Sequence, residues 1–370
     1  MPRLDVVRES KIIKTPRLMQ LEGIFDVPPS EKSAETWHID FELPKLWNVG
    51  LIVGPSGSGK STVAHELFGD SLVSGFEWSK EKSILDDFPK EMSIKEISGL
   101  LSSVGFSSPP SWVRPFHVLS NGEQFRVNMA RTLAEQKELA VVDEFTSVVD
   151  RTVAKIGSAA IAKTVRQRNQ KFIAVSCHYD IAEWLEPDWI YQPATNEFTG
   201  GRLLRRPKIN LEIKRVHSSA WQLFRKHHYL NTSLNTSAVC FCAFWDGVPV
   251  AFTAVLHFPH PIRKNTKREH RTVCLPDFQG VGIGNAMSAF IGSMCKGLGF
   301  SYLSTTTHPA MMRARAKSAN WKILRKPSRT SNIGKTSTEP WEHATQRFTA
   351  SFEYVGSALP KDEAQRIWNV

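Results

Sequence analysis

A glycine-rich segment near residue 54 has the residue types and spacing of a phosphate-binding loop. Gly54-Pro-Ser-Gly-Ser-Gly-Lys-Ser61 matches the pattern G-x-x-x-x-G-K-[S/T]. The glycines let the backbone point its N–H groups at phosphates, the lysine neutralises the β and γ oxygens, and the following hydroxyl can ligate Mg²⁺. The segment follows an apolar run and opens a helical pattern, as such a loop requires. We expect ATP and Mg²⁺ to be held by Gly54, Ser56, Gly57, Gly59, Lys60, Ser61 and Thr62.

Four further segments follow this loop in the order in which one family of ATPases carries them. Leu119-Ser-Asn-Gly-Glu-Gln124 opens a helical stretch, and Leu139-Ala-Val-Val-Asp-Glu144 ends an apolar one. Ser147-Val-Val-Asp150 comes next, and His178 follows another short apolar strand. They resemble the signature, Walker B strand, D-loop and switch histidine of ATP-binding-cassette (ABC) ATPases. The resemblance covers roughly residues 15–200.

The resemblance to ABC ATPases implies roles for individual residues. Asp143 and Ser61 are the expected Mg²⁺ ligands. Glu144 is the expected general base toward the attacking water, and His178 the switch histidine. These roles make the chain an expected ATPase.

The signature of this family meets the γ-phosphate held by another copy of the cassette. Ser120 and Gly122 would therefore contact a phosphate bound at Lys60 of a partner, so we expect an ATP-dependent homodimer. Lys60 and Ser120 are only 60 residues apart, which is short for the family's helical subdomain. No glutamine lies between Lys60 and Gln124, so the usual Q-loop residue is missing. We do not expect such a trimmed cassette to drive transport.

A second glycine loop, Gln279-Gly-Val-Gly-Ile-Gly284, closely resembles motif A of the GNAT acyltransferases. In such a loop the backbone N–H groups and the positive end of the following helix face a pyrophosphate. The pattern alone also fits a dinucleotide loop, but the upstream hairpin Trp245–Ala251 and the later strand Phe300–Ser304 favour GNAT. The resemblance implies acetyl-CoA, or another acyl-CoA, bound by Gln279, Gly280, Gly282 and Gly284.

Several side chains near this loop in the sequence are candidates for proton transfer. Glu269, His270 or His308 would accept the proton of an attacking amine. Tyr229 is a candidate proton donor or base-stacking ring. For each of them a packing or surface role is the alternative.

A basic run, Arg263-Lys-Asn-Thr-Lys-Arg-Glu-His-Arg271, precedes the glycine loop. A charge run of this kind is most often a solvated face, but here it adjoins the expected active-site mouth, where it could contact phosphates. Arg271 on this strand, with a His-Tyr pair upstream, faintly resembles the Mom-type phage enzymes that modify adenine in DNA. The intact glycine loop is a departure from that family's use of a different donor.

The elements that must position these residues indicate an α/β fold. Apolar strands at Asn48–Val53, Leu139–Asp143 and Phe172–Ser176 alternate with helical stretches, which predicts a largely parallel sheet. Further strands are predicted at Arg17–Leu21, Gly23–Pro28 and Trp37–Leu43, and an amphipathic helix at Trp221–Leu230. We expect an ABC-type ATPase domain over 1–200, a basic linker over 201–208, a GNAT-like domain over 209–327 and a C-terminal extension over 328–370, which is either a strand and helix or a partly ordered tail.

The composition of the chain indicates which classes of binding partner to expect. The 370 residues carry a formal net charge of +11, which is typical of chains that meet phosphates, most often nucleic acid. No run approaches the ~18–20 apolar residues of a membrane span, and the charged N-terminus lacks the apolar core of a secretory signal. Cys240 and Cys242 would share one face of a strand as buried thiols. We expect a reducing, cytoplasmic setting and no membrane partner.

The whole pattern resembles predicted phage and prokaryotic proteins in which an ABC ATPase is fused to an acetyltransferase-like domain. The first hypothesis is an ATP-hydrolysing acyltransferase that uses acyl-CoA to modify a base in DNA or another nucleic acid. The second is a DNA-binding ATPase of the repair or genome-maintenance type that keeps the GNAT fold without its chemistry. The third is a small-molecule or protein N-acetyltransferase gated by ATP.

Overall fold

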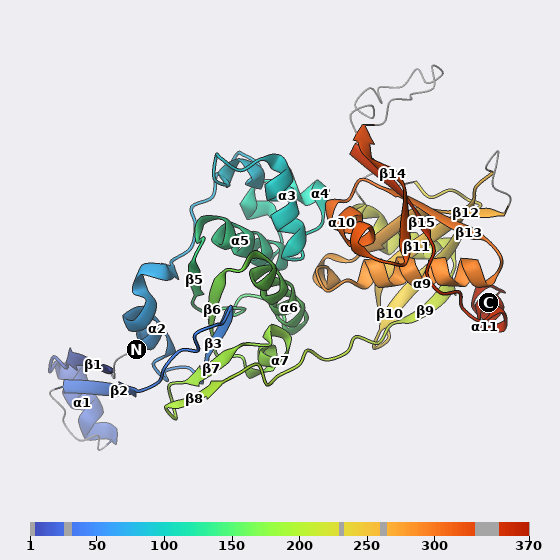
Figure 1. The fold of residues 1–370 in the computed structure, drawn as a ribbon. Coiled ribbons are helices and arrows are strands. Elements are labelled where there is room, and N and C mark those ends of the chain that lie inside the picture. The colour runs from blue at the N-terminus through green and yellow to red at the C-terminus, as the bar shows by residue number, and fades with distance from the viewer. Residues whose placement is uncertain (1–3, 26–31, 229–232, 260–264, 330–347, 370) are drawn as a thin grey trace. The chain divides into compact units, whose positions relative to one another are not determined.

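The computed structural model describes residues 4–25, 32–228, 233–259, 265–329 and 348–369 (Figure 1). The chain forms two compact units, and each is built from separate stretches of sequence. The first contains residues 1–75, 136–147 and 165–206. The second contains residues 76–135, 148–164 and 207–370.

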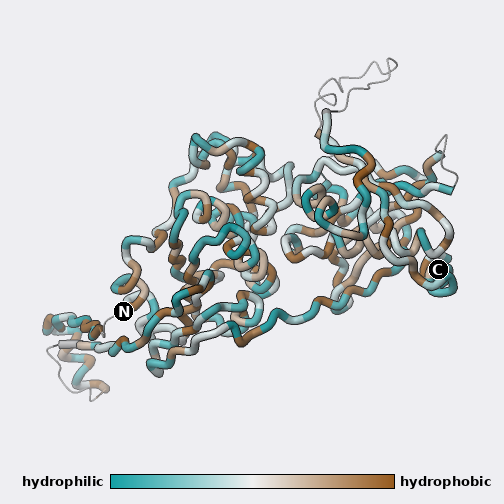
Figure 2. The backbone as a smooth tube through the Cα atoms, in the orientation of Figure 1, coloured by the Kyte–Doolittle hydropathy of each residue, from teal (hydrophilic) through white to brown (hydrophobic). Residues whose placement is uncertain are grey.

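A six-stranded sheet in the order β4-β5-β6-β3-β7-β8 forms the centre of the first unit. Its neighbours pair in parallel except β7 and β8, which are antiparallel, so the predicted largely parallel sheet is confirmed. Every residue of β3 is buried, as its continuous apolar run predicts, and Figure 2 shows hydrophobic residues along the strands. The strands are β3 (Val49–Val53), β4 (Leu72–Val73), β5 (Leu139–Val142), β6 (Lys171–Ser176), β7 (Trp189–Gln192) and β8 (Glu197–Gly200), and the helices of this unit include α2 (Lys60–Phe68) and α7 (Ala182–Leu185).

The N-terminal segment contains one helix where the sequence indicated strands. β1 (Leu4–Lys11) pairs antiparallel with β2 (Lys32–Ile39), and α1 (Pro16–Phe25) lies between them in the chain. The strand prediction for residues 17–25 is therefore wrong. Proline suits the first helical position, and the Leu, Met, Gln and Glu residues that follow are good helix formers. β2 ends at Ile39, before the predicted limit, and residues 26–28 lie outside the described part of the chain.

The helical segment of the second unit contains α3 (Ile94–Ser103), α4 (Pro109–Trp112), α5 (Asn121–Glu135) and most of α6 (Arg151–Arg168). α3 begins with a capping box in which Ser93 and Glu96 satisfy each other's backbone N–H groups. α5 and α6 confirm the helices predicted after the signature and after the D-loop. α5 is largely buried, because eight of its side chains lie in the interior.

A seven-stranded sheet in the order β14-β15-β13-β12-β11-β10-β9 completes the second unit. β12 and β13 run in parallel, and the other neighbours are antiparallel. The prediction that Cys240 and Cys242 share one face of a strand is confirmed, since both side chains belong to one hydrophobic cluster. Phe241 and Ala243 point to the other face of the sheet and belong to the cluster that includes α9. The elements are β9 (Glu212–Val216), β10 (Val239–Trp245), β11 (Val248–His257), β12 (Thr266–Cys274), β13 (Ser301–Thr306), β14 (Trp321–Arg329), β15 (Phe348–Tyr354), α8 (Trp221–Phe224), α9 (Ile283–Gly297), α10 (Pro309–Lys317) and α11 (Lys361–Asn369).

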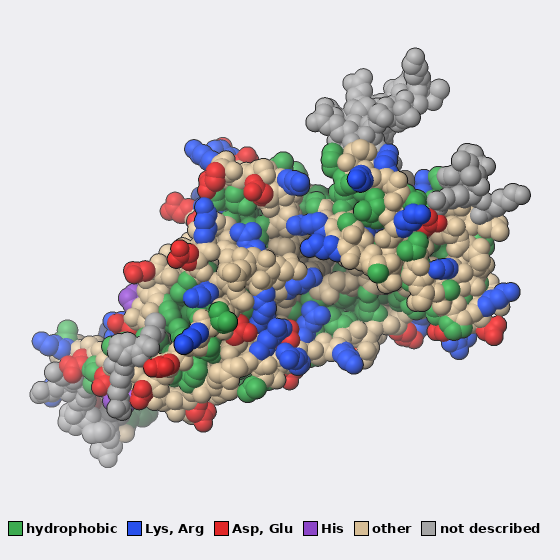
Figure 3. Space-filling view, in the orientation of Figure 1, with side chains coloured by type: hydrophobic (Ala, Val, Ile, Leu, Met, Phe, Trp, Pro, Cys, Tyr) green, Lys and Arg blue, Asp and Glu red, His purple; other side chains and the backbone are tan. Residues whose placement is uncertain are grey.

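Two sequence-based expectations change in this unit. The predicted helix from Trp221 is a single α-turn followed by a 3-10 turn at Arg225–His227, and Leu230 lies outside the described residues. Residues 348–369 of the predicted C-terminal extension form a strand and a helix, the first of its two alternatives: β15 lies between β13 and β14, and Trp368 of α11 packs against the core. Among the described residues, no helix combines the length and apolar character that crossing a membrane requires. Figure 3 shows Lys and Arg side chains on the surface of both units.

Candidate functional site

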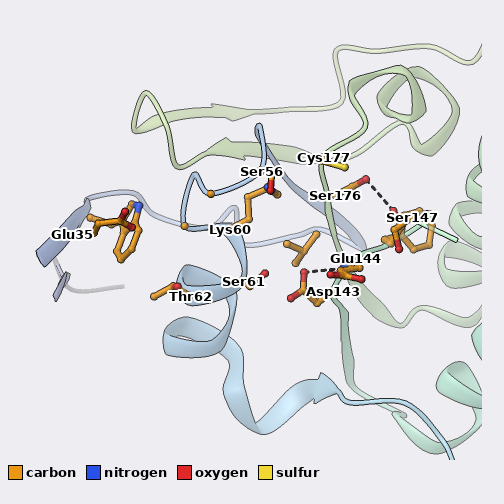
Figure 4. A pocket seen from close by; sticks show the side chains of 15 residues that line it. Glu35, Ser56, Lys60, Ser61, Thr62, Asp143, Glu144, Ser147, Ser176 and Cys177 are labelled. Atoms are coloured by element: carbon orange, nitrogen blue, oxygen red, sulfur yellow. Dashed lines mark hydrogen bonds between the residues drawn. The ribbon is translucent and has the colours of Figure 1, made fainter. Parts of the chain in front are cut away.

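A cavity of about 400 Å³ lies in the first unit, where the glycine loop meets the ends of β5 and β6 (Figure 4). Loop, helix and strand residues all contribute to its wall. The lining comprises Glu35, Trp37, Ser56, Gly57, Gly59, Lys60, Ser61, Thr62, Asp143, Glu144, Phe145, Ser147, Val175, Ser176 and Cys177.

The glycine loop joins β3 to α2 and has the backbone that phosphate binding needs. Gly57 and Gly59 adopt φ angles of 79° and 82°, which glycine reaches without strain. Lys60 Nζ donates to the carbonyl of Pro55 at 2.6 Å, so its ammonium is folded over the loop. The first N–H groups of α2 have no partner within the helix, and the helix dipole favours an anion there. Gly54, the first residue of the loop, donates its N–H to the carbonyl of Ser176 at 3.4 Å.

Two carboxylates stand at the end of β5, on the wall of the same cavity. Asp143 Oδ1 accepts the backbone N–H of Glu144 at 2.8 Å, and the Glu144 carboxylate is exposed. The Phe145 N–H donates to the Val175 carbonyl at 2.9 Å, and Ser176 Oγ donates to the Phe145 carbonyl at 2.9 Å. This loop is therefore fixed to the neighbouring strand β6. Oxygen donors from Ser61 and from Asp143 line one cavity, which fits the hard ligands that Mg²⁺ prefers.

His178 lies close to the carboxylate loop but is not among the lining residues. Its Nδ1 is 3.2 Å from Thr146 Oγ1, in the turn that follows Glu144. Its backbone N–H donates to Ser176 Oγ at 3.1 Å. The switch role predicted for His178 thus has a partner on the loop that carries the predicted base, although it stays a prediction.

Trp37 is a cavity residue that the sequence reading missed. Its Nε1 donates to the Ser58 carbonyl at 3.1 Å, and its ring lies against Gly59. A Cβ on Gly59 would fall 2.1 Å from Nε1 of this ring, so that position excludes any side chain. Trp37 and Ser58 are 21 residues apart in the sequence, and a lone tryptophan in a strand has no pattern that marks it as a ligand-site residue.

The two signature residues, Ser120 and Gly122, lie in the second unit at the start of α5. Ser120 and Glu123 form a capping box, with Ser120 N donating to Glu123 Oε2 at 3.0 Å. The place where a Cβ on Gly122 would sit is 3.7 Å from Asp277 Oδ1. The helix terminus expected to meet a nucleotide phosphate therefore has a carboxylate beside it.

The second glycine loop joins β12 to α9 and has one open and one covered side. Gly282 caps α9 with a φ of 97°, and no atom lies within 4 Å of the place of its Cβ. Gly284 is likewise uncrowded, with Cys274 Cβ at 3.9 Å. Gly280 is crowded, because its Cβ would lie 2.7 Å from Ala160 Cβ and 2.9 Å from Gly105 Cα. An anion can therefore approach the α9 terminus at Gly282, where the helix dipole favours it.

Gln279 is buried and its amide is engaged within the protein. Oε1 accepts the Ser107 N–H at 2.7 Å, and Nε2 donates to the Cys274 carbonyl at 2.8 Å. The predicted contact of Gln279 with a cofactor stays a prediction that would require these bonds to be exchanged.

Glu269 is buried in an ion pair where β12 and β13 separate. Arg315 Nη2 lies 3.0 Å from Glu269 Oε2, and hydroxyls of Thr272 and Ser288 donate to Oε1 at 2.7 Å each. Ser304 Oγ also donates to this carboxylate. Burial alone would raise the pKa of Glu269, but Arg315 and the three hydroxyls hold it below the ordinary value. A fully bonded carboxylate is a weak proton acceptor, so the geometry does not favour Glu269 as the general base.

His270 and Arg271, the next residues of β12, make other contacts. His270 Nε2 accepts the Asn235 N–H at 3.3 Å. Burial, with Arg271 and Arg268 nearby, lowers the His270 pKa to about 4. Arg271 donates to the carbonyls of His270 and Ser233 at 3.0 and 3.1 Å. Tyr229, the predicted donor or stacking ring, lies outside the described residues, so the structure does not place it beside these groups.

His308 precedes α10 and contacts the helical segment of the same unit. Its Nε2 lies 3.4 Å from the Ser107 carbonyl, and burial lowers its pKa to about 4. Nδ1 is buried without a hydrogen-bond partner among the described residues. The imidazole is therefore neutral near pH 7, and its Nδ1 is enclosed by the protein.

Arg126 and Arg315 are buried arginines that the sequence reading also missed. Burial lowers the pKa of Arg126 to about 10, and its guanidinium bonds two backbone carbonyls in the segment before the second glycine loop. Each arginine lies on a helix among ordinary helix formers, so nothing in its spacing indicates a buried partner.

Comparisons with known proteins find one family model and several proteins that are similar to part of the chain. Residues 207–316 match the model of the acetyltransferase (GNAT) family. The ribosome protection protein VmlR of Bacillus subtilis is 24% identical over 144 residues, which are 34% of this chain and 25% of that protein. Protein STAR1 of Oryza sativa is 28% identical over 172 residues, which are 37% of this chain and 49% of that protein. The chain thus spans half or less of the length of these two relatives.

Solved structures of ABC ATPases are also similar to part of the chain. CbiO1 of Clostridium perfringens, described as part of the ABC transporter complex cbiONQ, is 16% identical and has a TM-score of 0.34. The similarity covers 42% of this chain and 77% of that chain. The fold is mixed α/β, and residues 207–316 in its C-terminal part match the GNAT family model. The faint resemblance to Mom-type enzymes stays a prediction.

Proposed function

We propose that this chain hydrolyses ATP and transfers an acyl group from acyl-CoA to a base in DNA or another nucleic acid. One observation carries the proposal: the chain combines a phosphate loop facing two carboxylates with a second, open glycine loop in a segment that matches the GNAT family. The first arrangement suits a nucleoside triphosphate, and the second suits the pyrophosphate of coenzyme A.

In the ATPase site, the backbone of the glycine loop and Lys60 bind the phosphates. Ser61 and Asp143 hold Mg²⁺, which neutralises charge on the phosphates when bound. Glu144, exposed on the cavity wall, takes a proton from the attacking water. Trp37 offers an aromatic face beside the phosphate loop on which a nucleotide base can stack.

In the acyltransferase site, the Gly282 and Gly284 loop and the α9 terminus bind the pyrophosphate of the donor. The attacking nitrogen forms a bond to the thioester carbonyl carbon, the carbon–sulfur bond breaks, and coenzyme A leaves as a thiolate that takes up a proton. The nitrogen gives its own proton to a neutral imidazole. His270 and His308 are the candidates; both are neutral near pH 7, although a pKa lowered to about 4 makes each a weak base until it is displaced from its present contacts. Glu269 positions the diverging strands instead.

A nucleic-acid substrate is supported by charge and by one relative. The net charge is +11, and β12 carries Lys267 and Arg268 in the described part of the predicted basic run, whereas Arg263 and Lys264 lie outside it. The relative VmlR is a ribosome protection protein by name. Chemistry on a base within a duplex requires its extrusion, which costs a few kcal/mol, and an ATP-driven clamp can stabilise that distortion.

Mass analysis of nucleosides tests the substrate. Bulk DNA and RNA from cells that express the protein are digested separately and compared with material from cells expressing a Gly282→Glu variant. We expect an acylated nucleoside in one of the two pools that the variant does not produce. If both pools match those of the variant, a nucleic-acid base is not the substrate, and the small-molecule or protein acetyltransferase hypothesis takes its place.

A further inference from the structure

The segment that leads into the acyl-CoA loop is bound to the signature helix of the ATPase. Arg126, fully buried on α5, donates from Nη1 to the Pro276 carbonyl at 2.5 Å and from Nη2 to the Asp277 carbonyl at 3.0 Å. The two carbonyls belong to residues three and two positions before Gln279. All of these residues belong to the second compact unit, so α5 and the loop form one packed body.

The helical segment also covers one side of the loop itself. Ser107 binds the Gln279 amide, and Gly280 packs against Gly105 and Ala160 so closely that neither glycine tolerates a side chain. A second contact joins Arg313 of α10 to the Gly99 carbonyl of α3 at 3.2 Å. In this docked arrangement the Gln279 side chain and the Gly280 face are withheld from a cofactor, while Gly282 is open.

The docked loop brings a carboxylate to the phosphate-facing end of α5. Asp277 Oδ1 lies 3.7 Å from the place of a Cβ on Gly122. Burial raises the Asp277 pKa, Arg126 opposes that shift, and the carboxylates of Asp150 and Glu123 add to it. Three carboxylates therefore act on one another at the helix terminus that would receive a γ-phosphate.

We propose that nucleotide arriving at the signature releases the acyl-CoA loop from the helical segment, with Asp277 as the group that senses the phosphate. This inference rests on the proposed function and on the expectation from the sequence that Ser120 and Gly122 meet ATP held by a second copy. A triphosphate beside Gly122 repels the Asp277 carboxylate, because like charges a few ångströms apart repel each other, and more strongly where water is excluded. Displacement of Asp277 pulls on Pro276 and Gln279, which frees the covered face of the loop.

Release of the loop by ATP would thermodynamically couple ATP binding to acyl-CoA binding. If ATP favours the released loop and acyl-CoA prefers it, each ligand raises the affinity for the other by the same factor. Acyl-CoA would then bind productively when two copies have closed on ATP. The helical segment, which is short for a transport cassette, would thus deliver the ATPase signal to the acyltransferase of its own chain.

Hydrogen exchange of the backbone amides measures release without any need for acyl-CoA. The protein carries Glu144→Gln so that it holds Mg-ATP, and amides of residues 275–286 are followed with and without nucleotide. Protection of residues 54–62 reports that ATP is bound. We expect exchange in 277–282 to quicken about fivefold or more with ATP, the lower range of typical coupling. Unchanged or slower exchange there, with 54–62 protected, would overturn the inference.

Two variants identify the sensing group. Asp277→Asn removes the charge of this carboxylate and keeps its size, and we expect it to reduce the ATP effect on 277–282 to less than about twofold. Asp246→Asn, in the β10–β11 turn, is the matched control and should keep the full effect. Equal responses in the two variants would contradict the role of Asp277. Arg126→Met, if it folds, should quicken exchange in 277–282 before ATP is added.

The same samples separate this inference from the proposed function. If acetyl-CoA fails to bind but ATP still quickens exchange in 277–282, the acyltransferase proposal fails and the coupling stands. If acetyl-CoA binds equally well with and without ATP and exchange is unchanged, the acyltransferase stands and the coupling fails.

Discussion

Lys60 and Glu144 lie on opposite parts of one cavity and are expected to perform different tasks. Lys60 extends from the glycine loop and binds phosphate, whereas Glu144 stands at the end of β5 with its carboxylate exposed. The contact of Lys60 with the phosphates stabilises the bound nucleotide. The proton abstraction expected of Glu144 contributes only during hydrolysis. Substitutions at the two positions should therefore separate binding from turnover.

Glu144→Gln should keep ATP binding and lower the hydrolysis rate by about 100-fold or more, because general-base catalysis contributes typically 10²–10⁴-fold. Lys60→Ala should weaken ATP binding itself, because it removes the ammonium group that attracts the phosphates. Fluorescent-nucleotide titration gives the dissociation constant, and phosphate release gives the rate. Hydrolysis by Glu144→Gln at the parental rate would remove Glu144 from its role.

His308 makes the second unit sensitive to acid. Its pKa is about 4 in the folded chain and near 6.5 when unfolded, so between these values the unfolded chain binds the extra proton. The contribution of His308 to the free energy of unfolding is therefore complete above pH 6.5. It is lost as the pH falls toward 4, and the loss is about 1–2 kcal/mol at pH 5.

Urea unfolding at pH 7 and pH 5 measures this loss. His308→Gln keeps a side chain that can donate to the Ser107 carbonyl but cannot titrate, so it should reduce the pH dependence. His257→Gln, at an exposed position of β11 in the same unit, is the control and should not. If both variants lose the same stability on acidification as the parent, His308 is not the group responsible.

Among the secondary-structure elements, those whose formation depends on nearby residues were predicted correctly from sequence patterns. The buried run Val49–Val53, the helices after the signature and D-loop, and the Asp246-Gly247 turn all follow from periodicity, caps and turn residues. α1 was misread because the Leu, Met and Ile residues after Pro16 alternate weakly enough to fit either period.

Contacts between distant segments could not be predicted in this way. Arg126 binds carbonyls 150 residues later, and Arg315 meets Glu269 across 46 residues. Each is a polar residue in a buried place, where tertiary partners decide the outcome and sequence spacing carries no signal. The same holds for Trp37, whose ring contacts Gly59 from another element. Motifs marked the loops, but the side chains that support them appeared only in the structure.

At the scale of the whole molecule, one chain supplies one phosphate loop and one signature. If the signature closes on nucleotide held by another copy, two chains form two composite sites with a self-complementary interface. Nucleotide bound between copies then drives association by mass action.

ATP trapped by Glu144→Gln should therefore shift the chain from monomer to dimer. Sedimentation velocity at tens of micromolar protein, with and without saturating Mg-ATP, measures the shift. Lys60→Ala should stay monomeric under both conditions, since it lacks the bound phosphate that joins the copies. A monomeric Glu144→Gln protein in saturating ATP would mean that another protein supplies the second cassette.

Calorimetric titration of the full chain with acetyl-CoA shows whether the loop before α9 is a working acyl-CoA site. Gly282 and Gly299 flank the two ends of α9, both have positive φ, and both have open space at the place of a Cβ. A carboxylate at Gly282 would repel the pyrophosphate, whereas one at Gly299 would not. We predict one site per chain, with affinity at least about tenfold weaker in Gly282→Glu and unchanged in Gly299→Glu. No binding by the parent, or equal binding by the two variants, would contradict the account.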